Sequence, residues 1–197
     1  MIEVKINKED VNRVINKLRE ISPERRGGVA HRAFVDATAY LEQKLKLNIS
    51  GRILKVRSGR LRSSIGSLVM ERMGELQGLV GSGVRQGNRV VYANIHETGG
   101  VITPKRVKWL TIPLQAALTP AGVPRGKARD FENTFFAWSK AGNLILFQRR
   151  GNDVIPLFVL KKQVRIPARR YMSITAEECA GQIADIMVNR IVKEFNQ

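Results

Sequence analysis

Few side chains in this sequence could perform chemistry. Its histidines are His31 and His96, and its one cysteine is Cys179. A structural zinc ion normally takes four Cys or His ligands, which this supply does not provide. His96-Glu97 begins like the helix of a zinc peptidase, but Gly100 stands where that motif needs its second histidine. The sequence therefore predicts no metal site.

Carboxylates are also sparse in the middle of the chain. Asp130 and Glu132 could each bind a cation, but a nuclease needs several clustered carboxylates to hold Mg²⁺. The glycine-rich stretch 81–87 has neither the ending of a phosphate-binding loop nor the spacing of a dinucleotide fingerprint. We expect no catalytic residue, no cofactor and no enzymatic activity. A metal-dependent hydrolase using Asp130 and Glu132 is the weaker alternative.

Charge is the strongest bulk signal. Thirty-four Lys and Arg oppose seventeen Asp and Glu, which gives a net charge of +17. The stretches 49–110 and 111–170 each carry eleven basic and three acidic residues, a net +8 each. Such a cationic body attracts polyanions, either nucleic acid or an acidic protein surface. The plainer alternative is that the charge only keeps the protein in solution.

Length and composition indicate one domain over residues 1–197, since hydrophobic residues make up 43% and suffice for a core. No apolar run approaches the roughly 20 residues of a membrane-spanning helix, so we expect no membrane association. The N-terminus does not resemble a secretory signal, and a single cysteine fits a reducing cytosol.

Apolar spacing predicts helices near both ends of the chain. Residues 1–22 form an N-terminal strand and helix, and residues 28–48 form a long helix. Thr175–Glu178 reads as a capping box that starts a C-terminal helix. An apolar stripe follows along this helix, formed by Cys179, Ile183, Ile186, Met187, Ile191 and Phe195.

Strand patterns fill the region between these helices. A hairpin is expected around Gly74, and a short helix within residues 89–97. Further strands are expected at 101–102, 109–112, 144–148 and 155–160. Residues 50–60 read as an exposed, mobile loop, and 113–142 as an inserted flap with a local aromatic cluster of Phe131, Phe135, Phe136 and Trp138. The fold class is α+β, a mostly antiparallel sheet packed against the two long helices.

Three short blocks stand out. The first is 58–65, in which Ser58 can cap a helix and Leu61 and Ile65 share one face. The second is 92–100, where Tyr92 and Ile95 are expected to pack against the sheet. The third is 165–172, which ends in a candidate apolar anchor, Tyr171.

In this order the blocks resemble the tail-completion, or virion-morphogenesis, proteins of tailed phages, also called minor tail, neck or head–tail joining proteins. The first block matches that family's pattern at Ser58, Gly59, Leu61, Ser64 and Ile65. The second matches at Tyr92, Ala93, His96, Glu97 and Gly99. The third matches at Ile166, Pro167, Ala168 and Arg169, but has Arg170 and Tyr171 where the family usually has Pro and Phe.

The resemblance implies a structural phage or prophage subunit that assembles into a homo-oligomeric ring and joins tail to head. Its implied partners are connector or tail-tube proteins, and its place is the bacterial host cytoplasm during assembly and then the virion. The alternative is a basic nucleic-acid-binding protein. For both, the candidate contact residues are the cations of the loop at 52–62: Arg52, Lys55, Arg57, Arg60 and Arg62.

Overall fold

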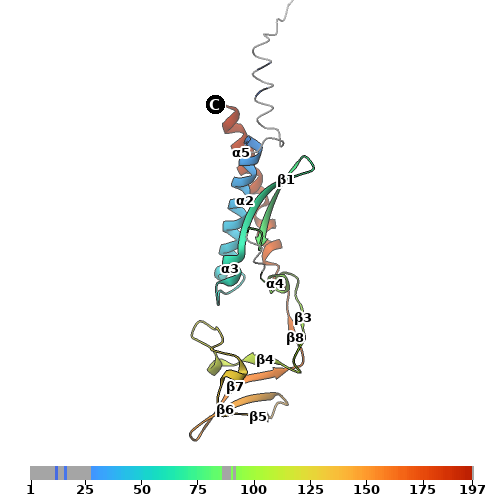
Figure 1. Ribbon diagram of the computed structural model, residues 1–197. Coiled ribbons are helices and arrows are strands. Elements are labelled where there is room, and N and C mark those ends of the chain that lie inside the picture. Colours follow the sequence, from blue (N-terminus) through green and yellow to red (C-terminus); the bar gives the residue numbers. More distant parts are fainter. Residues whose placement is uncertain (1–11, 13–15, 17–27, 86–89, 91, 197) are drawn as a thin grey trace, which may run out of the picture. The chain divides into compact units, whose positions relative to one another are not determined.

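The computed structural model describes residues 12, 16, 28–85, 90 and 92–196, so most of the expected N-terminal strand and helix lies outside the described residues (Figure 1). The chain combines helices with antiparallel sheets, which confirms the α+β class. It forms two compact units. Unit 1 comprises Met1–Lys55, Arg60–Ala93 and Arg170–Gln197, and unit 2 comprises Val56–Gly59 and Asn94–Arg169. The single domain expected over residues 1–197 stays a prediction.

Unit 1 is a pair of long helices with a β-hairpin. Helix α2 (Val29–Leu47) confirms the long helix expected at 28–48 and packs along α5 (Tyr171–Phe195), as Figure 1 shows. A π-helical turn, η1 (Asn48–Arg52), follows α2, and the short helix α3 (Arg60–Ser64) leads into the hairpin.

The hairpin consists of β1 (Ile65–Arg72) and β2 (Glu75–Ser82), and confirms the pattern around Gly74. Its two-residue turn places Met73 at φ 53° and Gly74 at φ 79°, the positive values that suit the twist of paired strands. The hairpin lies on α2, and Gly78 makes this contact possible: a Cβ there would lie 2.5 Å from Cγ2 of Thr38.

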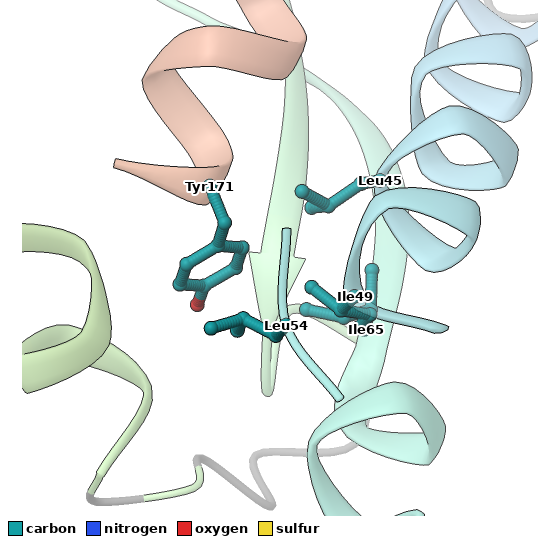
Figure 2. Packing of buried hydrophobic residues seen from close by; sticks show 5 residues of the cluster. All are labelled: Leu45, Ile49, Leu54, Ile65 and Tyr171. Carbon is teal, nitrogen blue, oxygen red and sulfur yellow. The ribbon is translucent and has the colours of Figure 1, made fainter. Parts of the chain in front are cut away.

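The core of unit 1 surrounds Tyr171 (Figure 2). This fully buried ring packs with Leu45, Ile49, Leu54 and Ile65, which come from α2, the turn after it and β1. The exposed loop expected at 50–60 is therefore wrong in part, because Leu54 is a core residue. Residues 55–58 are exposed, as expected.

The start of α5 corrects the predicted capping box. The helix begins at Tyr171, four residues before Thr175, and its N-cap Arg170 has φ 46° with no side-chain cap. Thr175 is fully buried inside the helix, where its hydroxyl donates to the carbonyl of Tyr171 at 2.5 Å. Five residues of the predicted apolar stripe are covered as expected, with Cys179 buried and Ile183, Ile186, Met187 and Ile191 half-buried. The side chain of the sixth, Phe195, lies outside the described part of the chain.

Unit 2 is built on a four-stranded antiparallel sheet of order β4-β7-β6-β5. Its strands are β4 (Leu110–Pro113), β5 (Thr134–Trp138), β6 (Leu144–Arg150) and β7 (Asp153–Lys161). A two-stranded ribbon pairs β3 (Gly100–Ile102) with β8 (Val164–Ile166). The helix α4 spans Ala93–Thr98, and all of it but Ala93 belongs to unit 2. Single 3₁₀ turns, η2 and η3, form at Gln115–Ala117 and Ala128–Asp130.

The expected flap at 113–142 is only partly a loop. Its residues Thr134–Trp138 form β5, an edge strand paired with β6. The expected local aromatic cluster is wrong, because its rings take different partners: Phe131 meets Phe158 edge-on, with ring centroids 5.5 Å apart, and Phe135 stacks on Phe147 at 5.7 Å. Phe136 and Trp138 are exposed.

Candidate interaction surfaces

Of the five candidate cations, Arg52 forms side-chain hydrogen bonds to two other residues. Its guanidinium donates to both carboxylate oxygens of Glu178 on α5, at 2.5 and 2.6 Å, and to Oδ1 of Asn48 at 3.0 Å. This hydrogen bonding raises the pKa of Arg52, and the hydrogen bond from Arg52 lowers the pKa of Glu178. Arg52 therefore joins η1 to α5 and is a weaker candidate for a partner contact.

The other four cations remain exposed, but they do not belong to one unit. Lys55, Arg60 and Arg62 are in unit 1, whereas Arg57 is in unit 2, where its side chain lies against Gly122. The loop at 52–62 is therefore not a single compact cluster within either unit.

The first block supplies both a core residue and a turn. Ile65 is buried and Leu61 is half-buried against the same core, as expected. Gly59 has φ 70°, which favours glycine, and Ser58 is exposed. The hydroxyls of Ser64 and Ser82 lie 2.8 Å apart and join this block to the end of β2.

The second and third blocks contact each other directly in unit 2. The amide of Arg169 donates to the carbonyl of His96 at 2.8 Å. Gly99 has φ 71°, and a Cβ there would lie 2.7 Å from the amide nitrogen of Ala168, so only glycine fits. Glu97 is half-buried, while Pro167 and Arg169 are exposed. Burial lowers the pKa of His96, and the positive charges of Arg169 and Arg57 lower it further.

The two motif tyrosines have different environments. Tyr171 is the expected anchor, and its phenolic hydroxyl donates to the carbonyl of Ala93 at 3.3 Å, inside unit 1. The prediction that Tyr92 is a core residue is wrong, because its side chain is exposed.

Glu42, on α2, joins this helix to β1, and the sequence analysis did not predict its role. Its carboxylate accepts hydrogen bonds from Lys46 and from Ser67 of β1, each at 2.6 Å, and lies 3.6 Å from Arg85. Burial raises the pKa of Glu42, but these hydrogen bonds and charges outweigh it and lower the pKa. The four-residue spacing of Glu42 and Lys46 indicates an ion pair within the helix. The contact of Glu42 with β1 joins residues far apart in the chain, so no local pattern predicts it.

The hairpin leaves an apolar surface uncovered. Directly opposite residues of an antiparallel pair share a face, and Leu68 faces Leu79 in this register. Both are exposed, as is Met70 two residues along the same face. The hairpin residues 65–82 carry two acidic side chains and one basic, a net −1, so charge does not oppose contact between two copies. We call Leu68, Met70 and Leu79 the hairpin surface.

A second uncovered apolar surface lies on β5, at the edge of the sheet in unit 2. Phe136 is opposite Leu146, which is opposite the buried Phe158. Trp138 is likewise in line with Leu144 and Leu160. The rings of Phe136 and Trp138 therefore continue the core face of the sheet, yet they are 62% and 67% exposed.

Unit 2 is also the more cationic of the two. Fourteen Lys and Arg against four Asp and Glu give it a net charge of +10. Among the described residues, no three His, Cys, Asp or Glu side chains are grouped so that they could hold a metal ion. None of the helices in the described part of the chain has the length and apolarity to cross a bilayer.

Comparison of the chain with protein-family models, with curated proteins and with solved structures finds no match.

Proposed function

We propose that this chain is a structural subunit of a tailed phage or prophage, acting in tail completion or head–tail joining, where it self-assembles and contacts other virion proteins. Its place would be the host cytoplasm during assembly and then the virion. The proposal takes its family from the three sequence blocks, and the arrangement of those blocks supports it.

The observation that carries the proposal is that the three blocks meet, although they are far apart in sequence. Tyr171 of the third block packs with Ile65 of the first and donates a hydrogen bond to Ala93 of the second. A second contact joins His96 to Arg169. Motif blocks that belong to one family pattern are expected to contact one another in the fold, and these three blocks do. We therefore treat the blocks as one structural pattern rather than three chance matches.

The hairpin surface is the best candidate for contact between copies. Leu68 and Leu79 lie side by side on a two-stranded sheet, and in the described part of the chain no third strand pairs with either edge. Exposed strand edges beside apolar side chains favour pairing with another chain.

Native mass spectrometry and negative-stain imaging of the purified protein test this proposal. We expect a closed oligomer, which the double substitution Leu68→Ser and Leu79→Ser shifts toward monomers. Val188→Ser, which removes an exposed apolar side chain from α5, is the matched control and should leave the oligomer intact. A protein that stays monomeric at high concentration would count against the proposal.

Nucleic-acid binding is the second candidate function, favoured by the exposure of Lys55, Arg57, Arg60 and Arg62. If the chain binds DNA, its affinity should fall steeply with salt. The logarithm of the association constant should drop by about 0.9 per phosphate contact for each tenfold rise in salt concentration. Replacing these four with Gln should flatten the slope. Arg52→Gln should change it less, because Arg52 is held by Glu178. An unchanged slope in the fourfold variant would exclude this use of the loop.

A further inference from the structure

Among the described residues, nothing pairs with the main chain of the edge strand β5 on its outer side. The amide of Arg149 donates to the carbonyl of Asn133, and the amide of Ser139 to the carbonyl of Asn143. In an antiparallel ladder, bonded positions alternate with positions whose main-chain groups point away from the partner strand. The register therefore directs the amides and carbonyls of Thr134, Phe136 and Trp138 away from β6. Within the part of the chain that the structure describes, β6 is the only strand that pairs with β5.

The same three residues carry their side chains on the core face of the sheet. Phe136 and Trp138 are in line with the buried residues Phe158 and Leu160 across the sheet. A strand added alongside β5 would place every second side chain next to these rings and so extend the core of unit 2.

The opposite face of this edge carries an arginine. Arg149 lies over the ring of Phe135, with its guanidinium carbon 5.7 Å from the ring centroid. Phe135 stacks on Phe147, so both rings and Arg149 lie on the face opposite to Phe136 and Trp138. An added strand would place its other set of alternating side chains on this face. Unit 2 as a whole carries +10. An added strand would therefore be favoured if its side chains on this face were acidic.

We propose that β5 is a docking edge for an extended segment of another protein, one that alternates apolar with acidic residues and adds to the sheet as a fifth strand. The inference rests on the proposed function, since the partner would be a neighbouring virion protein, and it adds the chemistry of that partner. A second copy of this chain is disfavoured here, because two surfaces of this charge repel each other. A single-stranded nucleic acid could stack on the rings, but it could not pair with the main chain of β5.

Fluorescence anisotropy with the full-length protein tests this inference. The first probe is a labelled peptide that alternates valine with glutamate. The second is the same peptide N-methylated along one edge, which blocks main-chain pairing and keeps the side chains. The third replaces glutamate with lysine, and the fourth is an oligothymidine strand. We expect the first peptide to bind, and the N-methylated and lysine peptides to bind at least about tenfold more weakly, as loss of central contacts does.

Variants locate the binding to β5. The double variant Phe136→Ser and Trp138→Ser should weaken the first peptide by about tenfold or more. Val107→Ser removes a side chain of similar exposure elsewhere in unit 2 and should have no effect. Circular dichroism of both variants checks that the sheet remains.

Three results would overturn the inference: no binding of the first peptide, equal binding of its N-methylated form, or binding that the double variant leaves unchanged. Tight binding of oligothymidine that the double variant abolishes would instead assign β5 to nucleic acid. None of these probes requires an oligomer, so failure here leaves the proposed self-assembly standing. A monomeric protein that binds the peptide would reject self-assembly alone.

Discussion

Units 1 and 2 use charge in different ways. In unit 1, acidic side chains hold basic ones across elements: Arg32 pairs with Glu194, Arg190 with Asp36, and Arg52 with Glu178. In unit 2, Arg129 pairs with its sequence neighbour Asp130, at 3.9 Å, within a single 3₁₀ turn. The acidic residues of unit 1 thus stabilise its helix packing, whereas the four acidic residues of unit 2 are too few to neutralise its fourteen cations.

The two units also differ in where they place aromatic rings. Unit 1 encloses an aromatic ring, Tyr171, between two helices and a hairpin, whereas unit 2 exposes two rings, Phe136 and Trp138, at the edge of its sheet. A surface that is both cationic and aromatic is suited to binding a partner. We therefore expect substitutions in the core of unit 1 to act on stability and those on β5 to act on binding.

The largest effect is expected from Tyr171→Ala. Removing this fully buried ring should lower the free energy of unfolding by about 3–5 kcal/mol, the usual cost of truncating a buried aromatic residue. Urea unfolding measures the loss, and hydrogen exchange should locate it in unit 1. Tyr171→Phe keeps the ring and loses the hydrogen bond to the carbonyl of Ala93, so it should cost only about 1 kcal/mol. Equal losses in the two variants would contradict this account of the core.

Thr175→Val should have a moderate effect. Valine keeps the shape of threonine, but the buried side-chain amide of Asn48 loses its acceptor, now 2.7 Å away. We expect a loss of about 1–3 kcal/mol in urea unfolding, the cost of leaving a buried polar group unsatisfied. Thr175→Ser retains the hydroxyl and is the matched control. A serine variant that is as unstable as the valine variant would assign the effect to packing.

Glu42→Gln should cost less, about 1 kcal/mol at neutral pH, because only the charged component of its hydrogen bonds is lost. The folded pKa of Glu42 is lowered, so its contribution is present above the unfolded pKa and is lost as pH falls through the folded pKa. The wild-type protein and the variant should therefore converge in urea unfolding at acid pH. A difference that persists at low pH would show that the carboxylate charge is not the cause.

The smallest effect concerns His96. Its folded pKa is lowered, so the unfolded state takes up a proton first as pH falls below about 6.5, and stability declines until the folded pKa is passed. His96→Gln should remove this decline and change little at neutral pH. The check is a set of urea unfolding curves at neutral and mildly acid pH. Arg169→Gln, which removes one of the two nearby charges, should reduce the decline without abolishing it.

The sequence was a good guide wherever local periodicity determines the structure. Helix α2 and the hairpin around Gly74 were predicted because their patterns depend on residues within one element. The start of α5 was not, because the Thr175–Glu178 pattern of a capping box competes with a tertiary contact. Thr175 instead bonds to Asn48, on the turn after α2, and no local pattern records that contact.

The interaction surfaces were harder to predict for the same reason. Arg52 and Arg60 read alike in the sequence, and only the packing of α5 brings Glu178 to one of them. Phe136 looked like part of a flap because proline and glycine flank its segment, and its exposure follows from the place of β5 at the edge of the sheet. Conversely, Gly99 and Tyr171 were found by their motif blocks, and the structure explains why glycine and an aromatic ring occur there.

The distance in sequence between the partners in the core of unit 1 affects the order of events during synthesis. Asn48 and Thr175 are 127 positions apart, and unit 2 lies between them in the chain. On a translating ribosome, the elements of unit 2 emerge before α5 does, so the sheet can form while α2 and the hairpin still lack their covering helix. The apolar faces of unit 1 then remain exposed until α5 is released. A chaperone that binds nascent chains is therefore expected to bind the hairpin and α2, and to dissociate once α5 packs and Tyr171 is buried.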